Sequence, residues 1–170
     1  MESKVRLLGH PVHQMLVAFP LGLLGTSVAA DLIHIFGQGE FSARLAYGLI
    51  ASGLIAGALA APWGAIDWLA IPAGTRAKRI GALHGAGNVL VLLLFLCSGL
   101  LRRGQTDAPP VPAYVLSFGG AALALVTAWL GGELVDRLGV GVSPNANLNA
   151  RSSLDGPAEP VRDAGPAGSP

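Results

Sequence analysis

Cysteine is almost absent from this chain of 170 residues, since Cys97 is the only one. A single cysteine excludes an internal disulfide bond and a cysteine-rich metal site. Charged residues are also scarce at 12% of the chain, whereas soluble domains carry roughly 25%. This composition excludes an ordinary soluble domain, and the formal net charge of +1 gives no basic footprint for nucleic acid.

Motifs of common enzymes are missing as well. The sequence shows no Ser/His/Asp arrangement for nucleophilic catalysis and no glycine-rich phosphate loop after a strand. No internal repeat is evident, beyond a histidine near a glycine at the start of the first and third apolar stretches. An enzyme therefore ranks last among the functions that we consider.

Apolar residues make up 52% of the chain and gather in four long stretches. Each stretch is near the roughly 20 residues that a helix needs to cross a 30 Å hydrocarbon core. The sequence therefore predicts an all-α fold, a four-helix up-and-down transmembrane bundle in membrane lipid, in which Pro20 bends the first helix. The predicted spans are Val12–Phe36, Ser42–Trp68, Ile80–Leu101 and Ala113–Val135.

The flanking segments differ in composition from the spans. Residues 1–11 form a short basic N-terminal segment, and residues 12–142 the four-span membrane domain. Residues 143–170 are rich in Pro, Gly, Ala, Asn and Ser, which predicts a disordered tail. The basic start resembles a signal peptide, but its apolar stretch exceeds the roughly 7–15 residues of an h-region, so we expect a retained helix.

The basic residues in the short connections predict the orientation, because Lys and Arg accumulate on the cytoplasmic side. The face with the N-terminus has more of them, so both termini are expected in the cytoplasm and the chain in the cell inner membrane. That face carries Lys4, Arg6, Arg76, Lys78, Arg79 and Arg137, and the opposite face Arg44, Arg102 and Arg103.

Four ionisable residues stand at the span ends that meet at the N-terminal face. His13 opens the first span, Asp67 closes the second, His84 opens the third and Glu133 closes the fourth. An ionisable residue in a membrane helix is costly and therefore indicates a functional site. In an up-and-down bundle the first and third spans are diagonal, so His13 and His84 are predicted to face each other at one depth.

Two opposed imidazoles are what axial ligation of haem b requires. Two imidazoles with carboxylates would equally suit a non-haem transition metal, and His10 is then a candidate third nitrogen ligand. Asp67, Glu133, or Asn88 one turn after His84, would orient the imidazoles. The function expected from this set is electron transfer to a redox partner protein.

Other interpretations of the polar residues remain open. The histidines and carboxylates could hold helices together, as in a structural subunit that anchors a partner, or form a proton or ion pathway. At the opposite face, Asp31 and His34 are interpreted as a local pair, joined by Arg44. A homo-oligomer is open as well. Small residues such as Gly53 and Gly57 indicate close helix packing.

The segment from Gly9 to Gly22, with His10-Pro11-Val12-His13 and Phe19-Pro20, resembles the opening signature of the DUF2231 family of bacterial four-span membrane proteins. Asp67 and His84-x-x-x-Asn88 are similar to its later signatures, and the resemblance extends to Asp136. It implies histidine-bearing spans, with some relatives tied to redox domains such as Rieske proteins, and no settled activity. Gln14 and Ala18 depart from the pattern, where a proline and, in some members, a histidine are expected.

Overall fold

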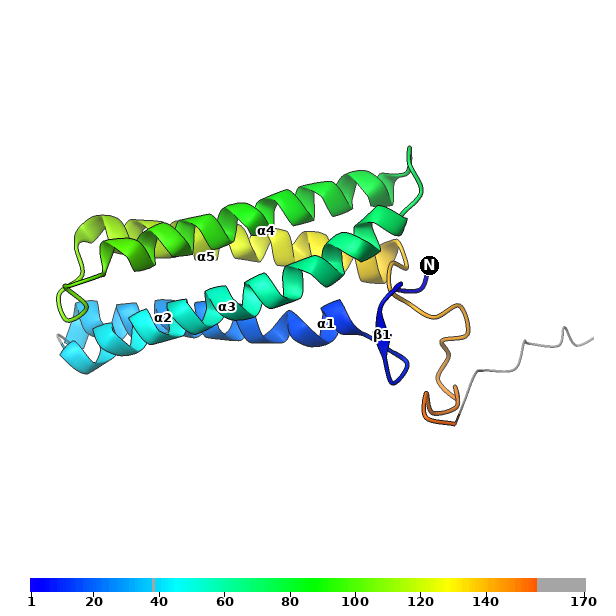
Figure 1. Cartoon of the computed structure of the whole chain (residues 1–170), viewed down its shortest axis with the longest axis horizontal. Coiled ribbons are helices and arrows are strands. Elements are labelled where there is room, and N and C mark those ends of the chain that lie inside the picture. Colours follow the sequence, from blue (N-terminus) through cyan, green and yellow to red (C-terminus); the bar gives the residue numbers. More distant parts are fainter. Residues whose placement is uncertain (38, 156–170) are drawn as a thin grey trace, which may run out of the picture.

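The computed structural model describes residues 1–37 and 39–155, and most of these residues form helices along the predicted spans. Four helical segments are long and apolar enough to cross a membrane: Val12–Gly37, Glu40–Ala70, Arg76–Leu101 and Val111–Arg137. They comprise α1 (Val12–Leu16), α2 (Ala18–Gly37), α3 (Glu40–Ala70), α4 (Arg76–Leu101), α5 (Val111–Gly132) and a closing π-helical turn, η1 (Glu133–Arg137). The predicted all-α transmembrane bundle is confirmed (Figure 1).

The first span is interrupted at Val17, which separates α1 from α2. Pro20 accounts for the position of this break, because it has no N–H to donate to the carbonyl of Leu16, four residues earlier. The helix resumes at once, since the N–H of Leu21 again reaches the carbonyl of Val17 at 3.3 Å. The irregularity that Pro20 predicts thus falls one turn before the proline.

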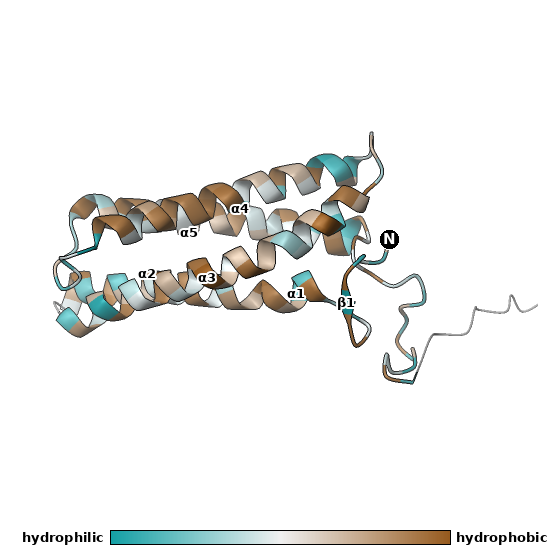
Figure 2. Ribbon diagram, in the orientation of Figure 1, coloured by the Kyte–Doolittle hydropathy of each residue, from teal (hydrophilic) through white to brown (hydrophobic). Residues whose placement is uncertain are grey.

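The helices form two antiparallel hairpins that lie side by side (Figure 1). The first hairpin pairs α2 with α3 and the second pairs α4 with α5, and helix contacts are denser within each hairpin than between them. Across the gap, α3 meets α4 and α2 meets α5, so the first and third spans are diagonal as predicted. Brown apolar residues run along the bundle and teal polar residues gather toward its ends (Figure 2).

The apolar core joins both hairpins near the middle of the bundle. Leu24 of α2, Ile50 of α3 and Val91 and Phe95 of α4 form one buried cluster. A methyl group on Gly120 of α5 would come within 2.9 Å of the Phe95 ring, so this position has room for hydrogen only. Such close approach of a backbone replaces the hydrophobic drive that lipid does not provide.

The two hairpins are related residue by residue, which the sequence analysis did not detect. The partners Asp31 and Arg102 are 71 residues apart, and the same offset relates the other pairs along α1–α2 and α4. These pairs are His13 and His84, Leu24 and Phe95, and Ser27 and Ser98. A second constant offset relates Gly53, Ala60 and Gly64 of α3 to Gly120, Thr127 and Gly131 of α5. Both hairpins also make equivalent contacts, His13 with Ala60 and His84 with Thr127, so the fold has an approximate two-fold axis along the bundle.

Packing along this axis is uneven. Residues 12–23 and 82–90, all of them described by the structure, include no buried residue. From Leu24 and Val91 onward the same helices bury a regular stripe that ends at Asp31 and Arg102. In α1, α2 and α4 the buried residues are therefore concentrated in the half remote from the N-terminus, whereas α3 and α5 still bury Ala60 and Thr127 in the half that carries His13 and His84.

The terminal segments lie together at the end of the bundle where α1 begins (Figure 1). The short strands β1 (Arg6–Leu7) and β2 (His10–Pro11) form an antiparallel pair just before α1. The N-terminal ammonium donates to the carbonyl of Gly139 at 2.7 Å, beyond the last helix. Within the segment predicted as a disordered tail, residues 143–155 form turns and irregular backbone, whereas residues 156–170 lie outside the described residues.

Candidate functional site

His13 packs against the neighbouring helix of its own hairpin. Its Nδ1 lies 3.1 Å from the carbonyl oxygen of Ala60 in α3, and the ring faces Gly64 one turn later. A carbonyl can only accept a hydrogen bond, so Nδ1 carries the hydrogen and Nε2 keeps its lone pair. The imidazole is thus fixed in the tautomer that leaves Nε2 basic.

His84 repeats this arrangement in the second hairpin. Its Nδ1 lies 2.9 Å from the carbonyl oxygen of Thr127 in α5, and its ring lies beside Gly131. Asn88 extends the site, since its Nδ2 donates to the His84 carbonyl at 2.8 Å and lies 3.2 Å from Nε2. The Asn88 carbonyl in turn accepts from the Thr127 hydroxyl at 3.1 Å.

Both histidines therefore have the same local environment at related positions of the two hairpins. Each lies near the start of its span, bonds a carbonyl of the next span and covers a glycine there. Two imidazoles whose Nδ1 atoms face backbone carbonyls are thus presented by two separate hairpins, and Nε2 of His84 lies beside the Asn88 amide.

The glycines beside the imidazoles yield a stability prediction. A Cβ at position 64 would lie 2.7 Å from Cε1 of His13, and one at position 131 would lie 3.1 Å from Cε1 of His84. We expect Gly64→Ala to lower stability by about 1–3 kcal/mol, the usual cost of overpacking, and Gly131→Ala by less. Thermal unfolding in detergent measures this, and Gly132→Ala, which has open space around its Cβ, should not destabilise. Equal melting temperatures for all three variants would contradict the packing argument.

Asp67 does not bond either imidazole; its carboxylate holds the N-terminal segment. It accepts from the Ser3 hydroxyl and from the backbone N–H of Lys4, each at 2.7 Å. Ser3 is buried by this contact. Asp67 thereby fastens the first residues of the chain across the end of α3.

Replacing Asp67 by asparagine should loosen this segment. The change removes the charge that strengthens both hydrogen bonds, which are worth roughly 1.5–3 kcal/mol each when one partner is charged. We expect faster amide exchange and faster proteolysis at residues 1–8, with the helices unaffected. Asp136→Asn, at an exposed position beyond the same membrane face, is the matched control. Unchanged exchange at residues 1–8 in the Asp67 variant would refute this role.

The remaining candidate residues of this face have other partners. Glu133 forms an ion pair with Arg76 at 2.7 Å. The Lys78 ammonium donates to the carbonyl of Trp68 at 2.7 Å and lies over the Trp68 ring. His10 is exposed on β2, with Ser153 as its neighbour. Among the described residues no three His, Cys, Asp or Glu side chains come together in a way that could hold a metal ion.

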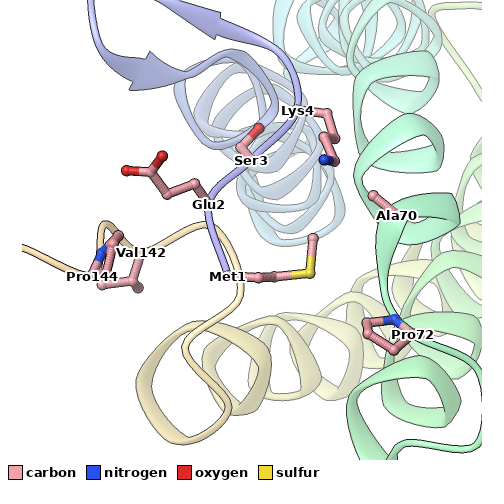
Figure 3. A pocket seen from close by; sticks show the side chains of 8 residues that line it. All are labelled: Met1, Glu2, Ser3, Lys4, Ala70, Pro72, Val142 and Pro144. Atoms are coloured by element: carbon pink, nitrogen blue, oxygen red, sulfur yellow. The ribbon is translucent and has the colours of Figure 1, made fainter. Parts of the chain in front are cut away.

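An open recess of about 490 Å³ lies at the same end (Figure 3). The N-terminal residues, the end of α3 and the segment after η1 surround it, and neither His13 nor His84 lines it. Its lining residues are Met1, Glu2, Ser3, Lys4, Ala70, Pro72, Val142 and Pro144.

A second polar cluster, which the sequence analysis interpreted differently, lies at the other end of the bundle. Asp31 and Arg102 form a bidentate ion pair, with both N–O distances 2.7 Å and both side chains 0% exposed. Ser117 donates to Asp31 at 3.0 Å, and the Ser98 hydroxyl lies 3.3 Å from Nε of Arg102. The Tyr114 ring lies 5.2 Å from the guanidinium carbon.

The predicted local pair of Asp31 with His34 and Arg44 is therefore wrong. His34 bonds the carbonyl of Gly39 at 2.9 Å, and Arg44 pairs with Glu40 and Asp107. Asp31 faces the interior of the bundle, as expected for a charged group in a membrane span, on the buried stripe that also carries Leu24 and Ser27. The available sequence signal was the spacing Ser27-x-x-x-Asp31, which Ser98-x-x-x-Arg102 repeats.

A comparison with protein-family models agrees with this architecture. No curated protein and no solved structure matches the chain. One family model, described as a predicted membrane protein (DUF2231), matches residues 9–144, which comprise all four spans and both histidines of the candidate site. The chain therefore belongs to the DUF2231 family of predicted membrane proteins.

Proposed function

We propose that this membrane protein binds haem b between its two hairpins, with His13 and His84 as the axial ligands, and transfers electrons to a redox partner protein. The observation that carries the proposal is the matched pair of Nδ1 contacts to the carbonyls of Ala60 and Thr127. Metal-ligating histidines almost always donate their other ring N–H in this way, which fixes the ring and raises its basicity.

The donor set favours haem over a metal held by side chains alone. The described residues provide two imidazoles here and no third ligand beside them. A porphyrin supplies four nitrogens of its own, so two axial imidazoles complete the coordination of its iron. If a transition metal binds without a porphyrin, water or a ligand from another molecule would have to complete its coordination.

The exposure of the two segments around His13 and His84 supports a ligand between the hairpins. Residues 12–23 and 82–90, within the described chain, bury no side chain, although they belong to two hairpins that contact each other. A flat ligand would cover that surface. Asn88 would then release Nε2 of His84 and keep its bond to the His84 carbonyl.

The basic residues support placing this end at the cytoplasmic face of the inner membrane. Arg102 is buried in an ion pair and no longer counts as a loop charge, so the excess of Lys and Arg at the N-terminal face is larger than the sequence indicated. Arg79 is exposed there and could meet a haem propionate. The redox partner would dock at this face.

A proton or ion pathway is less well supported. The two polar clusters lie at opposite ends, and the apolar cluster of Leu24, Ile50, Val91 and Phe95 lies between them. A continuous path would have to carry water or polar groups through that cluster.

Absorption spectroscopy of the protein purified from membranes tests the proposal. We expect a Soret band, a redox-dependent difference spectrum and about one iron per chain. A colourless protein without any stoichiometric transition metal would refute it. In that case the histidines act only as hydrogen-bonding links between helices, and their replacement would lower stability with no bound cofactor to lose.

A further inference from the structure

We infer that the two hairpins of this chain recognise each other through Asp31 and Arg102, which accept an unlike hairpin as partner and reject a like one. The partner that this surface fits is the complementary hairpin, either of the same chain or of a second copy. The inference concerns assembly and does not depend on haem.

Asp31 and Arg102 occupy the same position in the two related hairpins, 71 residues apart, and they meet each other at the approximate two-fold axis. Several related positions carry identical residues, as in His13 and His84 or Ser27 and Ser98. At this position alone among those related pairs the two hairpins carry opposite charges.

Because Asp31 and Arg102 are buried, their opposite charges decide which hairpins can pair. Both side chains are fully enclosed, so neither charge can turn to water. Two copies of the first hairpin packed in this geometry would bury two carboxylates together, and two copies of the second would bury two guanidinium groups. A buried charge without an opposite partner is strongly unfavourable, so such an arrangement excludes like hairpins.

The pair also sets the height of the histidines. His13 precedes Asp31 by the same number of residues as His84 precedes Arg102. An unlike pairing in this register therefore places both imidazoles at one depth. The bidentate geometry, with two parallel 2.7 Å bonds, tolerates little sliding between the hairpins.

A charge exchange tests the inference in the full chain. Asp31→Arg and Arg102→Asp should each lower the ratio of folded to unfolded protein roughly 100-fold or more, since each leaves like charges buried together. The double variant D31R/R102D should regain most of that loss. An arginine at position 31 would find Ser27 one turn earlier, in the place that Ser98 has beside Arg102. Arg103→Asp, at the exposed neighbouring position, is the matched control and should melt like the wild type.

Co-expression of two differently tagged full chains gives a second measurement. The D31R chain carries two arginines at the paired positions and the R102D chain carries two aspartates, so neither can pair its own hairpins. Exchange of hairpins between the two chains would restore two unlike pairs. The short connection from Ile71 to Thr75 is the type of hinge that favours such swapping. We expect each tag to capture the other variant only when both are co-expressed.

Either of two results would overturn the inference. One is a D31R/R102D chain that melts as low as the single variants. The other is a mixed complex no more abundant than the complex formed between two tagged copies of the D31R chain. Neither measurement involves haem content, so a colourless protein would leave this inference intact.

Discussion

Replacing Arg102 by alanine should destabilise the bundle by about 3–5 kcal/mol, the usual cost of leaving one member of a buried ion pair without its partner. Asp31 would lose both of its 2.7 Å bonds to the guanidinium and would keep only the Ser117 hydroxyl at 3.0 Å. Since domains are stable by only roughly 5–15 kcal/mol, this loss should be visible as a large drop in melting temperature. Asp31→Ala should behave in the same way.

A neutral double variant separates the charge from the packing. Combining Asp31→Leu with Arg102→Met removes both charges and keeps most of the volume, and such replacements are often neutral or stabilising. We expect this variant to melt close to the wild type. Thermal unfolding followed by tryptophan fluorescence in detergent measures all three proteins. Single variants that melt within a degree or two of the wild type would show that water reaches the cluster.

Much of the fold could be predicted because hydropathy indicates where each span begins and ends. The observed spans begin and end within a few residues of those predicted, as with Val12–Gly37 for the predicted Val12–Phe36. A long apolar stretch in lipid must satisfy its backbone internally, so it has to be helical. Short connections then make neighbouring spans antiparallel, which places the first and third on a diagonal.

The partners of the polar residues were harder to predict, because they depend on how helix faces meet. Arg102 follows directly after α4 and looks like a loop residue in the sequence, yet it turns back to a carboxylate 71 residues away. Asp67 looks like a candidate for the histidine layer, yet its partners Ser3 and Lys4 lie in a terminal segment with no motif. Hydropathy carries no information about such distant contacts.

The internal repeat was hidden for a related reason. The two hairpins differ at many corresponding positions, such as Leu24 and Phe95 or Ala60 and Thr127. Their shared feature is the spacing of the positions, and this becomes visible once the helices are superposed by their contacts. The candidate site could be anticipated in part, because a histidine opening a membrane span is conspicuous by itself.

Alanine at position 84 should abolish the haem spectrum if the proposed function holds. Removal of an axial imidazole leaves iron with one protein ligand, so we expect the Soret band and bound iron to disappear from His84→Ala and likewise from His13→Ala. His34→Ala is the matched control. This histidine also lies in a span and also bonds a backbone carbonyl, at 2.9 Å, but at the opposite end of the bundle, so its variant should keep its spectrum.

Stability must be measured beside the spectrum, because each histidine also links two helices. Loss of one such hydrogen bond in a membrane protein costs about 0.6–2 kcal/mol, so the variants should remain folded. Added imidazole should restore the Soret band of His84→Gly, since the small ligand can enter the vacated space beside Gly131. A folded His84→Ala protein that retains a full Soret band would show that other residues hold the haem. Asn88→Ala should weaken haem binding about 10–100-fold, because Asn88 bonds the hydroxyl of Thr127, whose carbonyl orients the His84 ring.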